Sequence, residues 1–231
     1  MRSITTYLMS ERGKCMPEES PRTWSDFDIR KIVGADLMEP IQTEQSAVVH
    51  ADDRLCVQVN RVRNVATNEA WQSLRVVPVD VAQYVAVIVP VLRDGRLLFV
   101  GRYRYALERW TIELPRFWSV TDDAGWKYVA NDQLHRHVGI DAKKMTLLGA
   151  IQPDSALAAG NTVVILAEDC VQRATRPADP RALVAGTVGI APDELYRLIL
   201  RGDVDCGVSL AALHLYDAHA RRSGNGQRQP I

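Results

Sequence analysis

Three polar side chains have a spacing that would bring them together in one site. Gln133, Arg136 and His137 stand at positions i, i+3 and i+4, which share one face of a helix. A guanidinium such as that of Arg136 binds a phosphate or carboxylate through two parallel hydrogen bonds. His137 could act as acid or base near neutral pH, whereas His135 would point to solvent. The pattern indicates a site for an anionic ligand, although solvated side chains without a function would produce it equally well.

The helix that would present these side chains is predicted over 126–138. Asp122 or Asp123 can cap its start, and Gly139 stands where a left-handed residue often ends a helix. Further helices are predicted over 193–201 and 209–221, with a short one near 29–33. Strands are predicted from alternation or short apolar runs over 55–60, 70–79, 84–92, 96–102, 110–114, 147–151 and 162–167.

Composition excludes several classes of function. The 231 residues carry 28 basic and 28 acidic side chains, so no nucleic-acid partner is indicated. The longest apolar run, 85–92, is too short to cross a bilayer, and the N-terminus resembles no secretory signal. The four cysteines form no CxxC pair, which argues against a zinc site or a disulfide framework. We therefore expect a cytoplasmic protein with no cofactor and no membrane partner.

The stretch from Glu113 to Ile140, ELPRFWSVTDDAGWKYVANDQLHRHVGI, resembles the motif of Nudix hydrolases. Three other segments, VLRDGRLLFVGRYRYAL, LLGAIQPDSALAAGNTVVILA and DELYRLILRGDVDCGVSLAALHLY, occur in the order and spacing of the ADP-ribose pyrophosphatase branch. The resemblance covers roughly residues 54–221. It implies an α/β fold, the Nudix α/β/α sandwich around a mixed sheet, preceded by an N-terminal β-hairpin.

The resemblance also suggests how the chain is divided. Residues 1–50 would form a partly flexible extension, 51–82 the hairpin, 83–222 the Nudix-like domain and 223–231 a disordered tail. In many relatives this hairpin exchanges across a homodimer, so a homodimer is expected here as well.

The resemblance implies a metal site that these residues do not provide. Family enzymes carry glutamates at the positions of Gln133, Arg136 and His137, where they hold a divalent cation. An arginine about 4 Å from one positive charge costs roughly 4 kcal/mol at an effective dielectric of 20, and a dication about doubles that cost. We therefore expect no bound metal. The degenerate motif predicts that Arg136 and its neighbours hold an anion directly.

Other family positions are altered too. An earlier glutamate falls near Ala124, and the glycine of the motif becomes Phe117 or Trp118. A glutamate of the later loop, present in some relatives, aligns with Gly160. Phe117, Trp118 and Trp126 would either fill the mouth of the cleft or line it as an apolar pocket for a smaller, flatter ligand.

Three further residues are candidates through the resemblance. Arg104, the second arginine of GRYRY, matches a residue that contacts substrate phosphate or ribose, and a surface ion pair is the alternative. Glu113 matches the glutamate of the ELP entry, where it would touch a ligand or pair with an arginine. Trp71 resembles a tryptophan that stacks on a nucleobase, with burial in a dimer interface as the alternative.

Three functions follow from these observations. The first is a metal-independent Nudix-fold protein that binds or transforms a small anionic or nucleotide-like metabolite. If it is an enzyme, His137 would be the acid/base, and Arg136 would stabilise developing negative charge. The second is a non-catalytic pseudoenzyme that acts as a sensor or assembly partner. The third is a residual ADP-ribose or nucleoside-diphosphate-sugar pyrophosphatase that uses surviving aspartates.

Overall fold

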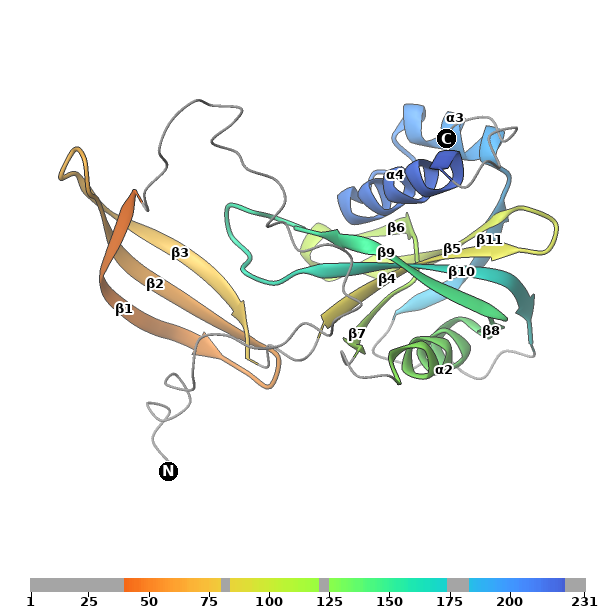
Figure 1. Cartoon of the computed structure of the whole chain (residues 1–231), viewed down its shortest axis with the longest axis horizontal. Coiled ribbons are helices and arrows are strands. Elements are labelled where there is room, and N and C mark those ends of the chain that lie inside the picture. The colour runs from red at the N-terminus through yellow and green to blue at the C-terminus, as the bar shows by residue number, and fades with distance from the viewer. Residues whose placement is uncertain (1–39, 80–83, 121–124, 174–182, 223–231) are drawn as a thin grey trace.

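The computed structural model describes residues 40–79, 84–120, 125–173 and 183–222. They form a small three-stranded sheet and a larger mixed sheet with helices on both faces (Figure 1). The predicted α/β/α sandwich around a mixed sheet is therefore confirmed. The short helix predicted near 29–33 lies outside the described residues.

The small sheet consists of β1 (Ile41–Ala51), β2 (Leu55–Asn64) and β3 (Ala70–Pro78), all antiparallel, with β2 in the middle. Asn64 closes the β2–β3 hairpin by accepting backbone hydrogen bonds from the turn. The hairpin was predicted, but β1 was not. Its side chains are almost all exposed and mostly polar, so no apolar alternation reveals it.

The larger sheet has the order β11-β5-β4-β10-β8, with β6 on β5, β7 on β4 and β9 on β10. Only β10 and β4 run parallel among its paired strands, which makes the sheet mixed. Its strands are β4 (Tyr84–Leu92), β5 (Leu97–Arg104), β6 (Arg109–Glu113), β7 (Arg116–Val120), β8 (Ile140–Asp141), β9 (Lys144–Ile151), β10 (Thr162–Gln172) and β11 (Val184–Ile190).

Helices cover the two faces of this sheet (Figure 1). On one face, α2 (Trp126–Val138) buries Ala130, Leu134 and Val138 against the strands. On the other face, α3 (Pro192–Arg201) and α4 (Gly207–Arg222) enclose a second apolar core. The near-continuous apolar run of β4 follows from this arrangement, because a strand covered on both faces needs apolar residues at every position.

The C-terminal end of α2 is the one that the sequence predicted. Gly139 ends the helix with a φ of 71°, and its N–H donates to the carbonyl of His135, as predicted. At the start of the helix, Gly125 occupies the cap position. Asp122 and Asp123, which were predicted to cap this helix, lie outside the described residues.

Strands β7, β8 and β11 were not predicted. β7 follows Pro115, and its five residues, RFWSV, are too few to register as periodic and do not alternate. β8 has two residues, and β11 contains two glycines within seven positions. Each is held by pairing with a longer neighbour, so its own sequence gives a weak signal.

The small sheet is joined to the main domain through backbone hydrogen bonds from β3. The N–H of Val76 donates to the carbonyl of Leu157, and the N–H of Ala159 donates to the carbonyl of Val76, each over 2.9 Å. The contact forms a short parallel bridge between β3 and the loop that follows β9. These bonds place residues 75–78 beside the main sheet.

Candidate functional site

A group of charged side chains lies where β5 and β6 end and β7 begins. Glu113 is 3% exposed, and Arg104 binds both of its carboxylate oxygens, one of them over 2.7 Å. Thr111 Oγ lies 2.6 Å from Glu113 Oε1 and 3.0 Å from the carbonyl of Arg102, so its proton serves one of them at a time. Arg104 and Glu113, which were predicted ligand-binding residues, are therefore brought together as an ion pair.

The environment of Glu113 keeps it ionised. Burial acts to raise its pKa, but hydrogen bonds from Arg104 and Thr111 outweigh burial, so the pKa lies below the ordinary 4.5. The same bond raises the pKa of Arg104 above its usual value. Both groups are charged at neutral pH.

Two more arginines surround this pair. Arg102 is buried and donates over 3.1 Å to the carbonyl of Arg116, while its Nε has no partner within the described residues. Burial, followed by the charge of Arg104, lowers the pKa of Arg102 to about 10, so it is still protonated at neutral pH. Burial likewise lowers the pKa of Arg116, and the charge of Arg104 adds to that effect.

Arg116 is the residue that sequence reasoning missed. Its guanidinium has no hydrogen-bonded or ion-paired partner among the residues the structure describes. Glu113 is already taken by Arg104 and Thr111. We call Arg102, Arg104, Arg116 and Glu113 the arginine cluster; it carries two positive charges in excess. The signal that could have identified Arg116 is its position directly after ELP, as the charged residue among the apolar side chains of 114–118.

The face of α2 that was predicted to bind a ligand holds two of its three residues together. His137 Nε2 and Gln133 Oε1 lie 3.0 Å apart, and the imidazole stacks on Phe117 with 5.1 Å between ring centres. Phe117 itself is buried in the core beneath α2. His137 is thus fixed in position by an amide on one side and an aromatic ring on the other.

Arg136 and His135 point elsewhere. The side chain of Arg136 is 61% exposed and pairs with Asp132 one turn earlier on the helix. His135, expected to point to solvent, is only partly exposed and bonds Asp141 over 2.8 Å. The structure therefore does not bring Arg136 together with Gln133 and His137.

Trp71 lies on β3 in the small sheet, opposite Val62 of β2, and is 40% exposed. The other two tryptophans near the presumed cleft differ in surroundings. Trp118 lines a pocket beside the small sheet, whereas Trp126 is partly buried against the core under α2. Phe117, Trp118 and Trp126 were the aromatic residues expected at the cleft mouth, and of these Trp118 is the one that lines the pocket.

Gly160 has a steric reason to be glycine. A Cβ built there would lie 2.9 Å from Cγ of Pro78, a contact closer than real Cβ atoms make. The space that a side chain at 160 would need is therefore occupied by the end of β3. A longer side chain at 160 would require Pro78 to move.

The described residues do not fit a divalent cation. No group of three or more His, Cys, Asp or Glu side chains among them is placed to hold a metal ion. The three helix positions at which the resemblance implied metal ligands, 133, 136 and 137, carry an amide, a guanidinium and an imidazole. Magnesium takes oxygen ligands and is usually held by carboxylates.

Comparison with solved structures identifies the fold. A crystal structure described as an ADP compounds hydrolase aligns with a TM-score of 0.67, over 82% of this chain and 99% of that one, at 16% sequence identity. No protein-family model and no curated protein sequence matches the chain. At such low identity the likeness shows the fold alone, which is Nudix-like. Among the described residues, no helix is long and apolar enough to cross a membrane.

Proposed function

We propose that this Nudix-fold protein binds a small anionic or nucleotide-like metabolite without a divalent cation. The arginine cluster carries the proposal, because its three guanidinium groups face one carboxylate in a largely buried setting. An unpaired charge removed from water is costly. A ligand oxyanion beside the cluster would supply the missing counter-charge.

The remaining predicted residues have roles in the same proposal. Arg104 and Glu113 form the rigid base of the site, and Gln133 with His137 contributes polar groups from α2. Arg136 would swing to a bound anion, since an exposed ion pair such as that with Asp132 is worth at most about 1 kcal/mol. Any acid or base step in a reaction would fall to His137.

A ligand screen tests this function. Thermal unfolding would be followed with ADP-ribose, nucleoside monophosphates, sugar phosphates and simple carboxylates, each in the presence of EDTA. A ligand at 100 times its Kd stabilises by about 2.7 kcal/mol, which is easily measured as a rise in Tm. At least one anion should stabilise the protein, and Arg136→Ala should weaken that effect. EDTA-sensitive hydrolysis of ADP-ribose would instead favour a residual pyrophosphatase, and co-purification of a protein with no ligand effect would favour a pseudoenzyme.

Metal addition should leave the protein unchanged. In 5 mM Mg²⁺ or Mn²⁺ and in EDTA we expect the same Tm, because the α2 positions lack carboxylates. The matched variant carries Gln133→Glu, Arg136→Glu and His137→Glu together. It restores three carboxylates at the family spacing, and Mn²⁺ should then raise its Tm. A Tm of the unmodified protein that falls in EDTA would contradict metal independence.

We also propose a homodimer formed through the small sheet. On one face of that sheet, Leu74 is 46% exposed beside Val59, and Val76 stands opposite Val57. Apolar side chains left partly open in this way mark an interface.

Light scattering after size exclusion should give the mass of two chains. Leu74→Asp should shift the protein towards the monomer, because it places a charge within the apolar face. Val188→Asp on β11 is the control, since Val188 is similarly exposed but lies on the main domain. A monomeric unmodified protein at micromolar concentration would rule out the dimer.

A further inference from the structure

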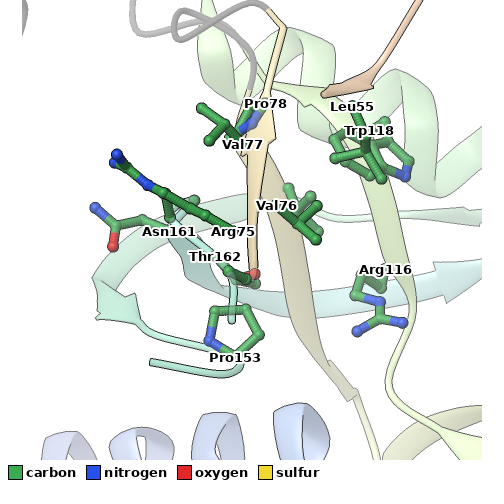
Figure 2. A pocket seen from close by; sticks show the side chains of 14 residues that line it. Leu55, Arg75, Val76, Val77, Pro78, Arg116, Trp118, Pro153, Asn161 and Thr162 are labelled. Carbon is green, nitrogen blue, oxygen red and sulfur yellow. The ribbon is translucent and has the colours of Figure 1, made fainter. Parts of the chain in front are cut away.

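A pocket lies between the small sheet and the main domain (Figure 2). Its volume is about 440 Å³, within the range of small-molecule sites. One wall is residues 75–78 of β3, another is the loop 153–162, and β7 provides Arg116 and Trp118. The pocket is thus assembled from segments far apart in the sequence, with Leu55 and Val85 completing the lining.

Most of the pocket surface is apolar. Valine, proline and alanine side chains make up much of the lining, and the indole of Trp118 adds a flat aromatic surface. In Figure 2, Trp118 and Arg116 stand on one side of Val76, and Arg75 and Asn161 on the other. A planar, apolar ring fits such walls, because aromatic faces stack with favourable energy on other rings.

The positive charge in the pocket comes from Arg75, which is exposed, and from Arg116. The guanidinium of Arg116 belongs both to the pocket lining and to the arginine cluster, where Glu113 is committed to Arg104. Within the described part of the chain, no acidic side chain pairs with Arg116. A planar guanidinium in this state is suited to a carboxylate or phosphate, which it can bind through two hydrogen bonds.

The walls are held in place before any ligand arrives. The backbone bonds between Val76 and residues 157 and 159 fix β3 against the loop. Gly160 allows Pro78 to approach the loop more closely than any other residue would. A preformed pocket loses less conformational entropy on binding, which favours affinity.

We propose that this pocket binds a planar aromatic ring bearing one oxyanion group, with the ring against Trp118 and the oxyanion on Arg116. The ligand class is an aromatic compound that carries a single carboxylate or phosphate group. This inference rests on the proposed function, since it uses the charge excess of the same cluster. It goes further than the proposed function by naming the pocket, the aromatic ring of the ligand, and Trp118 and Arg116 as the residues that bind it.

Isothermal titration of the full-length protein in EDTA tests the proposal with four probes. 1-Naphthoate and AMP each join a flat ring to an oxyanion, whereas acetate and inorganic phosphate carry the oxyanion alone. At least one ringed probe should bind at least tenfold more tightly than its ringless counterpart. Binding of 1-naphthoate alone would identify a carboxylate ligand, and binding of AMP alone a phosphate ligand. Equal affinity with and without the ring, or no binding of either ringed probe, would overturn the proposal.

Variants locate the binding site. Arg116→Met should lower the affinity for the ringed probe by about 10- to 100-fold, as expected for the loss of a charge-assisted hydrogen bond. Trp118→Leu should weaken it by about 3- to 10-fold and remove any quenching of indole fluorescence on binding. Arg96→Met, which removes an exposed partner of Asp94, should have no effect. Circular dichroism would confirm that each variant is folded.

The variants also separate this proposal from the broader one. If a ringed anion binds and neither Arg116→Met nor Trp118→Leu changes its affinity, the protein binds anions elsewhere and the pocket assignment is wrong. If Arg116→Met is poorly folded, Arg116→Lys keeps the charge without the planar fork. It should lower the affinity for the probe severalfold, and unchanged affinity in that variant would count against the assignment of the pocket.

Discussion

Replacing Arg104 with methionine should destabilise the protein by about 3–5 kcal/mol, because a buried carboxylate then loses its partner. Glu113 is almost fully buried and would keep only the hydroxyl of Thr111. Such a loss is a large part of the 5–15 kcal/mol that typically holds a domain folded. Chemical denaturation followed by circular dichroism would measure it. Arg197→Met is the matched control, because its exposed pair with Glu194 should contribute less than about 1 kcal/mol.

The same pair makes stability depend on pH in a defined direction. The pKa of Glu113 is lower in the folded protein than its ordinary 4.5, so the folded state favours the ionised carboxylate. Its contribution is fully present above pH of about 4.5 and is lost as the pH falls through the lower, folded-state pKa. Glu113→Gln should therefore flatten the stability profile in this acidic range. An unchanged acid slope in that variant would mean that folding does not lower the pKa of Glu113.

Phe117→Ala should cost about 3–5 kcal/mol, the usual range for removing a buried aromatic side chain. Phe117 packs beneath α2 and also stacks on His137. Phe117→Leu retains most of the volume and should cost less than about 1.5 kcal/mol, which separates packing from stacking. Tyr128→Ala, on the exposed side of the same helix, is the control. A small effect of Phe117→Ala would show that the α2 core does not depend on this ring.

The sequence was sufficient for elements with strong local signals. Gly139 marks the end of α2 because a left-handed residue follows the last turn, and the apolar run of β4 marks a strand covered on both faces. β1 escaped prediction because its partners, rather than its own residues, hold it in a sheet. Local patterns report what a segment prefers, and edge strands owe their conformation to neighbours.

The candidate site was predictable only in part. Arg104 and Glu113 were identified, but their mutual pairing depends on the register of β5 against β6, which spacing does not reveal. Arg136 was predicted to face the site from helical periodicity, yet its bond to Asp132 directs it along the helix surface. Arg116 was missed, because its lack of a partner among the described residues depends on how strands distant in the sequence meet around it.

The contact between Gly160 and Pro78 constrains how this chain could change over evolution. A carboxylate introduced at 160 while the proline ring is present would meet it at 2.9 Å and displace the edge of the small sheet. A larger side chain at 160 would need a smaller residue at 78, so two positions more than 80 residues apart in the chain must change together.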